Sequence, residues 1–437
     1  MLFERKDPGK VHKGSILVGY DLGDDFSQIS YCTLGESEVE SVATVVGTRQ
    51  YNIPTALCKL NGANQWFYGK DALKFSDKEQ NNLVTNLLTA AKKGESIVLE
   101  QTEYDPIALL TLFLKRSLSL LGFAASADRI DAIMLTVSDL DDRMVEVLAK
   151  AAVNLNLRTN HIYFQSHTES FYHFVLNQKE ELWNYQVLAC EHDGVQLKTY
   201  RLERNKRTTP VVVLIEEQIY GTMVLPKEEE PEEIKSDSYR LADEKFLQIL
   251  QNLCDGRIFS SAYLLGDGFR DNWAEKSLQF LCRNRRVFQG NNLFCKGACY
   301  SLIEKFEPSK VESEHIFLGP DKLKSNIGMK VMKRGKESYF ALLDAGENWY
   351  EVYRECEIIL PDGETEIIFL ITPLTGKGET AEIVTLENAP FPGGAFRRYR
   401  IEMKMTSAEN VSVILTDLGF GELSAASGKV WEKSFSV

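Results

Sequence analysis

Two apolar segments of the sequence each end in an acidic turn that contains glycine. The first runs from Val18 to Asp25 and the second from Leu188 to Val195. A strand-like run follows each turn, which predicts two strands that fold back in antiparallel pairs. Backbone amides in such turns can contact phosphate oxygens, and glycine lets the backbone come close to them. A nucleotide therefore fits between two such halves, its phosphates held by the two turns and its base by a third loop.

Other common chemistries find little support in the residue types and their spacing. The eight cysteines are scattered and form no CxxC pair, which argues against a disulfide framework or a zinc ribbon and indicates reduced thiols. His161, His167 and His173 recur every six residues and so do not share a helix face. The segment 376–378 has two glycines around Lys377, but it lacks the upstream glycine of a phosphate loop and indicates a hairpin turn. We expect no metal site.

Composition and charge exclude several classes of function. The chain of 437 residues has 50 Lys and Arg against 63 Asp and Glu, a formal net charge of -13. Such a surface repels nucleic-acid backbones and anionic lipid. The N-terminal residues lack the apolar core of a secretory signal, and no apolar stretch approaches the length of about eighteen residues that spans a membrane. We therefore expect a cytoplasmic protein with no nucleic-acid partner and no membrane insertion.

The elements that must position the two turns form an α/β region over residues 1–307. It divides into a first lobe over about 1–184 and a second over about 185–307, each opening with antiparallel strands. Asp105 is predicted to cap a helix that ends near Gly122, and Ser138 or Asp139 to cap another. The segment 226–238 is acidic and polar and contains two prolines, so we expect a solvated loop there. The remaining elements of this region are expected at 14–24, 26–34, 38–46, 51–58, 130–137, 166–177, 187–190, 197–202, 211–215, 243–254, 260–265, 273–282 and 296–305.

A separate all-β domain is predicted over residues 308–437. Short strand-like runs recur there, separated by turn signals, and no helical periodicity appears. The expected strands are 328–332, 338–343, 349–353, 356–360, 366–372, 380–386, 396–405 and 411–417. Phe391 and Phe396 flank two glycines in one loop and are candidate peptide-binding residues, if they are exposed at one end of a sandwich; the alternative is a loop packed on its own domain.

These segments, in this order, resemble the actin-like ATPase superfamily and specifically the DnaK-type heat-shock chaperones. The resemblance covers nearly the whole chain but lacks the helical lid. It implies a two-lobed α/β ATPase fold followed by an all-β sandwich, with ATP and Mg²⁺ as cofactors. It places Asp21, Lys74 and Glu191 as the candidate catalytic residues, Lys74 with one inserted residue. It places five residues at the phosphate loops and the adenosine-binding turn as candidate cofactor contacts: Gly23, Asp24, Gly194, Gly266 and Gly268.

The departures from the family pattern bear on the activity. Asp24 and Asp25 stand where the family has small hydroxyl residues, and two carboxylates beside a polyphosphate repel it unless Mg²⁺ bridges them. At the second turn, Asp193 and Val195 replace two glycines, and a β-branched side chain obstructs the approach of phosphate. Ser166 replaces a glutamate that helps to position metal-bound water.

Each surviving residue also has a purely structural interpretation. Asp-Leu-Gly after a strand is a common turn, a lysine such as Lys74 in a charged loop is usually only solvated, and Gly266 and Gly268 suit a turn that needs positive φ. Three functions stay open. The first is a chaperone-like pseudo-ATPase that binds partner proteins or peptides and hydrolyses ATP weakly or not at all. The second is an active Mg-ATP-dependent ATPase, and the third is a nucleotide-free structural or assembly module.

Overall fold

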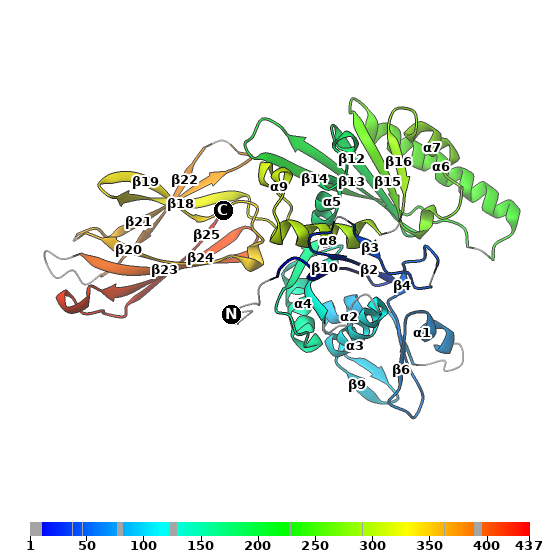
Figure 1. Cartoon of the computed structure of the whole chain (residues 1–437), viewed down its shortest axis with the longest axis horizontal. Helices are drawn as coiled ribbons and strands as arrows, with labels where there is room; N and C mark the ends of the chain where they lie inside the picture. Colours follow the sequence, from blue (N-terminus) through cyan, green and yellow to red (C-terminus); the bar gives the residue numbers. More distant parts are fainter. Residues whose placement is uncertain are drawn as a thin grey trace. The chain divides into compact units, whose positions relative to one another are not determined.

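The computed structural model describes residues 11–36, 38–45, 47–76, 82–122, 129–227, 229–290, 292–361, 363–376, 378–388 and 396–437. Its contacts divide the chain into two compact units (Figure 1). The first comprises Met1–Arg204 and Val213–Glu314, and the second comprises Asn205–Val212 and His315–Val437. The first unit is mixed α/β and the second is built from antiparallel strands. Within the described residues, no helix is both long and apolar enough to cross a bilayer.

The first sheet of the α/β unit is built around strand β1 (Ile16–Leu22). It also contains β2 (Phe26–Thr33), β3 (Glu40–Ser41), β10 (Ile130–Val137) and β11 (Ile162–Ser166), in the order β11-β10-β1-β2-β3, while β4 (Ile53–Pro54) pairs with β2. Strands β1 and β2 are antiparallel, whereas β10 is parallel to both β1 and β11. The turn between β1 and β2 therefore lies at the same edge as the carboxyl ends of β10 and β11.

The second sheet repeats this order with later strands. Its members in the first unit are β12 (Gln186–His192), β13 (Leu197–Asn205), β14 (Val211–Tyr220), β15 (Phe259–Leu265) and β16 (Arg286–Gln289). The last residue of β13 and the first two residues of β14 belong to the second unit. They are arranged β16-β15-β12-β13-β14. Strands β12 and β13 are antiparallel, and β15 is parallel to β12 and to β16. If β4 is left out and the other strands of each sheet are numbered in chain order, both sheets have the spatial order fifth, fourth, first, second, third. These five strands are therefore connected in the same way in the two sheets.

Two helices pack closely against each other and against the first sheet. They are α5 (His167–Leu176) and α8 (Leu293–Phe306). A Cβ atom on Gly297 would lie 2.0 Å from the carbonyl oxygen of Ser170, and one on Gly19 would lie 2.1 Å from that of Cys295. Only glycine permits these two approaches, because no real Cβ atom tolerates such a distance from backbone. The position of α8 against β1 and α5 is thereby set at two backbone contacts.

The remaining elements of the first unit flank the two sheets. They are β5 (Leu57–Lys59), β6 (Trp66–Tyr68), α1 (Gly69–Ser76), β7 (Leu83–Val84), α2 (Leu87–Lys93), β8 (Ile97–Leu99), β9 (Thr102–Tyr104), α3 (Pro106–Leu118), α4 (Asp142–Leu155), α6 (Glu232–Cys254), α7 (Glu275–Leu281) and α9 (Lys310–Glu314), with short 3-10 turns at Ser119–Leu121, Glu180–Leu182 and Asp267–Phe269. Asp105 caps α3 by accepting from the backbone N–H of Ile107, as predicted. The cap of α4 is Asp141, which accepts from Met144, rather than Ser138 or Asp139.

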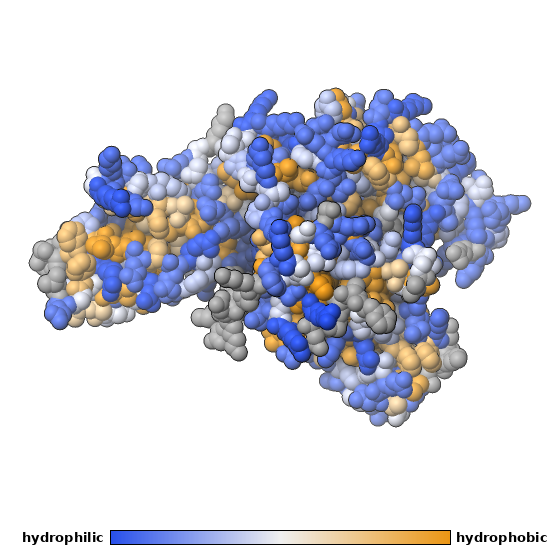
Figure 2. Space-filling view, in the orientation of Figure 1, coloured by the Kyte–Doolittle hydropathy of each residue, from blue (hydrophilic) through white to orange (hydrophobic). Residues whose placement is uncertain are grey.

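The acidic segment 226–238 is in part helical, which corrects the prediction of a solvated loop. Helix α6 begins at Glu232 directly after Pro231. Acidic residues in the first turn, here Glu232 and Glu233, stabilise a helix N-terminus through its dipole, so the same charges that suggested a loop favour the helix. Hydrophilic side chains cover the exposed end of this helix in Figure 2.

Among its described residues, the second unit contains two four-stranded antiparallel sheets and a short strand, β17 (His315–Phe317). The first has the order β19-β18-β21-β22, formed by β19 (Lys336–Leu343), β18 (Ser325–Lys333), β21 (Glu366–Pro373) and β22 (Thr380–Thr385). The second has the order β20-β23-β24-β25, formed by β20 (Tyr353–Leu360), β23 (Arg397–Ser407), β24 (Asn410–Gly419) and β25 (Val430–Ser436). The rings of Phe369 and Phe435, one from each sheet, lie 6.0 Å apart.

Two features of the second unit differ from the expected strands. Residues Trp349–Glu351 form a 3-10 turn rather than the strand expected at 349–353, and β25 was not expected. The alternation of Trp431, Lys433 and Phe435 is the signal for β25, but the turn residues before it obscured the register. The buried Arg397 and Asp417 form an ion pair between β23 and β24.

Candidate functional site

Next to the first turn of the candidate site, the carboxylate of Asp21 contacts the imidazole of His167, and both side chains are largely buried. Asp21 lies near the end of β1, and its Oδ1 is 2.8 Å from Nε2 of His167, the first residue of α5. The imidazole stacks on the ring of Phe294, with centroids 3.9 Å apart and planes 9° apart. Burial opposes protonation, but the charge and hydrogen bond of Asp21 and the charge of Glu191 outweigh it and raise the pKa of His167. Asp21 therefore has a protein partner of its own.

Glu191 comes from the second sheet, at the end of β12. Its Oε2 accepts a hydrogen bond of 2.9 Å from the hydroxyl of the buried Tyr200. Burial raises the pKa of Glu191, partly opposed by the nearby His167 and Lys198. Lys198 itself forms an ion pair of 3.0 Å with Glu217. Glu191, like Asp21, is thus tied into contacts that protein side chains supply.

The second turn, between β12 and β13, uses its own side chains to satisfy its backbone amides. Asp193 Oδ1 accepts from the N–H groups of Val195 and Gln196, both at 2.7 Å. His192 Nδ1 accepts from the N–H of Gly194 at 2.9 Å. Gly194 has a φ of +101°, a conformation that favours glycine. Its amide, like those of Val195 and Gln196, already has an acceptor. The three amides of this turn are therefore committed within the turn, which does not fit binding of a triphosphate there.

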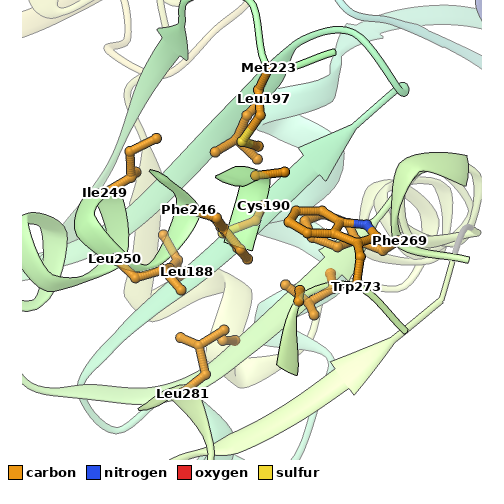
Figure 3. Packing of buried hydrophobic residues seen from close by; sticks show 14 of the residues in the cluster. Leu188, Cys190, Leu197, Met223, Phe246, Ile249, Leu250, Phe269, Trp273 and Leu281 are labelled. Atoms are coloured by element: carbon orange, nitrogen blue, oxygen red, sulfur yellow. The ribbon is translucent and has the colours of Figure 1, made fainter. Parts of the chain in front are cut away.

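The third turn, Gly266 to Gly268, packs directly on His192. A Cβ atom on Gly266 would lie 2.3 Å from the carbonyl oxygen of His192, and one on Gly268 would lie 2.2 Å from its Nδ1. Both glycines are thus required by the approach of two protein segments. Figure 3 shows the apolar cluster around this turn, with Phe269 and Trp273 beside Phe246 and Leu188.

The two other first-turn residues have structural contacts. A Cβ atom on Gly23 would lie 2.8 Å from the carbonyl oxygen of Phe26, so the tight turn itself requires glycine. Asp24 points to the N-terminus of α2, where its carboxylate accepts from the backbone of Leu88 at 2.9 Å and of Thr89 at 3.0 Å, and from the Thr89 hydroxyl. A carboxylate at a helix N-terminus is favoured by the free N–H groups and the dipole.

The adjacent Asp25 faces the second turn. Burial raises its pKa, and the nearby carboxylates of Asp193 and Asp24 raise it further. The two turns therefore present like charges to each other. Within the described residues, no three His, Cys, Asp or Glu side chains are grouped so that they could hold a metal ion.

Lys74 lies apart from these residues. Its side chain is 75% exposed on α1 and sits 3.9 Å from Asp71 of the same helix. Lys70, one helical turn earlier, lines a cavity instead, and its Nζ donates to Oε1 of Gln50 at 2.8 Å. Of the residues expected at one nucleotide site, Asp21 and Glu191 share electrostatic contacts with His167, whereas Lys74 is not among them.

The cavity that Lys70 lines has a volume of about 860 Å³ and joins both halves of the first unit. Phe26, Arg49 and Asn52 contribute from the first half, and Asp267, Arg270 and Gln289 from the second. Asn52 Nδ2 donates to Asp267 Oδ1 at 2.9 Å and so links the halves. Arg270 forms an ion pair of 2.9 Å with the same aspartate. Of the expected site residues, Gly266 alone lines this cavity.

Sequence reasoning did not single out His167, Arg49, Lys70 or Arg270 as site residues. His167 directly follows β11 and the Ser166 cap, and that position beside the carboxyl ends of the parallel strands was a usable signal. Arg49, Lys70 and Arg270 carry no comparable signal, because they come from three separate places in the chain. In the second unit, Phe396 is 57% exposed, and Phe391 lies outside the described residues.

Comparison with protein families covers most of the chain in two adjoining pieces. Residues 38–320 match the family described as "Family of unknown function (DUF5716) C-terminal". Residues 322–437 match the family described as "Domain of unknown function (DUF8552)". A comparison with curated proteins finds no match. The first match spans the second and third turns of the candidate site and the whole cavity except Phe26.

Proposed function

Since the chain belongs to the family described as "Family of unknown function (DUF5716) C-terminal", whose description gives no activity, we propose its function from the geometry of the candidate site. The protein is a chaperone-like pseudo-ATPase of actin-like, two-lobed plan that binds partner proteins and hydrolyses ATP weakly or not at all. The shared connectivity of the two sheets supports the two-lobed plan, since two lobes that each open with antiparallel strands are what that plan requires.

A single observation carries the loss of hydrolysis: the second turn gives its three amides to His192 and Asp193. Catalysis of phosphoryl transfer depends almost wholly on positioned donors and cations around the phosphates. Here the donors are satisfied, Asp21 is paired with His167, and the facing Asp25 and Asp193 add negative charge. A triphosphate could bind only if the hydrogen bonds of the second turn and the Asp21–His167 pair were broken. Among the described residues, no cluster of carboxylates offers a metal site that could compensate for their loss.

Exposed apolar side chains on the second unit support a protein partner. Ile368 on β21 pairs in register with Ile383 on β22, and both side chains are over two-fifths exposed. Tyr339 on β19 is exposed to a similar degree. Figure 2 shows hydrophobic residues among hydrophilic ones on the visible face of this unit. Apolar side chains gathered on a surface are typical of protein contacts.

The test is calorimetric titration with ATP and Mg²⁺, combined with a phosphate-release assay on the same preparation. We expect phosphate release to be weak or absent, and we expect Asp21→Ala to leave its rate unchanged. Turnover that is lost in Asp21→Ala would contradict the proposal and favour the active ATPase. Absence of both binding and turnover would agree with a nucleotide-free form of the same scaffold.

A further inference from the structure

The cavity between the halves of the first unit concentrates positive charge in an acidic protein. It is lined by Arg49, Lys70 and Arg270 and by one acid, Asp267. Arg270 is neutralised by its ion pair with Asp267. Within the part of the chain that the structure describes, neither Arg49 nor Lys70 has a carboxylate at ion-pair distance, and Lys70 donates to the neutral Gln50. Two positive charges therefore remain unneutralised at one cavity.

We propose that this cavity binds a phosphate monoester attached to a flat ring. A phosphate monoester carries a charge of about -1.5 to -2 at pH 7, which matches the two unneutralised cations. A carboxylate or sulfate ester brings only one negative charge, and a triphosphate brings more than the two cations offset. The planar fork of Arg49 suits phosphate oxygens, and the ammonium of Lys70 acts as a point charge beside it.

The cavity also has room and chemistry for the organic part of such a ligand. Its volume of about 860 Å³ lies within the usual range for small-molecule sites, roughly 300–1,000 Å³. Phe26, a residue that is 41% exposed, lines the cavity, and so does Pro54, which adds apolar surface. A flat ring stacks favourably on an exposed aromatic face. Asn52 and Gln289 also line the cavity, and protein hydrogen bonds hold both of them in place: Asn52 Nδ2 donates to Asp267, and Gln289 Nε2 donates to the carbonyl oxygen of Phe269.

The ligand would contact both halves of the first unit and strengthen the link that Asn52 and Asp267 already make. The inference does not depend on the proposed loss of hydrolysis, because Asp21, His167 and Glu191 are not among the residues that line the cavity. Detection of ATP turnover would therefore not contradict the proposed phosphate-monoester site.

The test is isothermal titration of the full chain with phenyl phosphate and, separately, with phenyl sulfate, in metal-free buffer at low ionic strength. The two probes have nearly the same shape and differ by about one charge at neutral pH. We expect saturable binding of phenyl phosphate and at least tenfold weaker binding of phenyl sulfate. Lys70→Gln and Arg49→Gln should each weaken binding of phenyl phosphate by about fivefold, the upper range for a partly exposed charge pair.

Lys74→Gln is the matched control, because it removes the same charge from the same helix at an exposed position away from the cavity. It should leave the affinity unchanged. The proposal is overturned if phenyl phosphate shows no saturable binding, if the sulfate binds equally well, or if Lys74→Gln weakens binding as much as Lys70→Gln does.

Discussion

Oδ1 of Asp21 on β1 lies 2.8 Å from Nε2 of His167 on α5, a pair formed across 146 positions of the chain. The pair sits where the carboxyl ends of β1, β10 and β11 meet, and Phe294 covers the imidazole. Because the imidazole of His167 is buried, its charged form depends on the nearby carboxylate of Asp21, which raises the pKa of His167. The contact gives the first turn a fixed electrostatic partner within the protein.

The pH dependence of stability tests this pair. The pKa of His167 is raised in the folded protein, so the folded state binds the proton more tightly than the unfolded state. The stabilisation by the His167–Asp21 pair is fully present at pH values below the ordinary histidine pKa of about 6.5. It is lost as the pH rises through the pKa of His167 in the folded protein. In Asp21→Asn the free energy of unfolding should be lower by about 3 kcal/mol at pH 6, and the difference from the wild type should shrink toward pH 9. Urea unfolding from pH 6 to pH 9 measures the free energy of unfolding of both proteins. A difference that does not change with pH would contradict an ion pair between Asp21 and His167.

Replacement of Gly266 tests the close packing of the third turn on His192. Gly266→Ala would place Cβ 2.3 Å from a backbone carbonyl oxygen at a φ of +88°, and we expect a loss of more than about 3 kcal/mol of stability. Gly256→Ala is the control: Gly256 also has positive φ, +66°, but nothing lies within 4 Å of its Cβ position. That variant should lose only about 1 kcal/mol. Thermal or urea unfolding measures both losses. Equal losses of stability in the two variants would show that the positive φ alone, and not the contact with His192, destabilises Gly266→Ala.

The capping of the second turn by Asp193 can be separated from its charge. Asp193→Asn keeps an oxygen acceptor for the amides of Val195 and Gln196, whereas Asp193→Ala removes it. Both changes remove the negative charge that faces Asp25. We expect Asp193→Ala to be less stable than Asp193→Asn by about 1 kcal/mol, with faster hydrogen exchange at both amides. Identical exchange in the two variants would mean that the aspartate does not satisfy them in solution.

Asp24 is predicted to stabilise α2 rather than to contact a ligand. Asp24→Ala removes the acceptor of the Leu88 and Thr89 amides and should cost about 1–2 kcal/mol. Amide exchange at Leu88 and Thr89 should accelerate. Asp25→Ala is the matched control, since the pKa of Asp25 is raised by burial and by nearby carboxylates, and its removal should leave stability unchanged or higher. A larger loss in Asp25→Ala than in Asp24→Ala would refute this assignment.

Local signals predicted the elements well where each acts within a few residues. The helix after Asp105 and the strand Ile130–Val137 follow from a cap, a proline at the first turn and a continuous apolar run. The start of α6 was missed because acidic composition near Pro231 is shared by loops and by helix N-termini. A local sequence pattern does not show the packing contacts that decide between a loop and a helix N-terminus.

The site contacts were less predictable because they join distant segments. Nothing near Lys74 in the sequence distinguishes it from Lys70, yet Lys70 lines the cavity and Lys74, one helical turn later, does not. The partner of Asp21 is set by the packing of α5 on the first sheet, and Asp24 meets α2 across 64 positions. In contrast, the self-capping of the second turn was implicit in His192 and Asp193, since aspartate often accepts from amides two and three residues ahead.

The second unit is assembled from two stretches of chain that are over a hundred residues apart, Asn205–Val212 and His315–Val437. Val212 is fully buried there among Leu318 and Ala345. During synthesis on the ribosome the earlier stretch emerges more than a hundred residues before Leu318 and Ala345, so Val212 lacks these packing partners until the C-terminal stretch is made. A cut at position 314 would likewise leave neither fragment with a complete set of contacts, which makes this protein a poor subject for dissection by simple truncation.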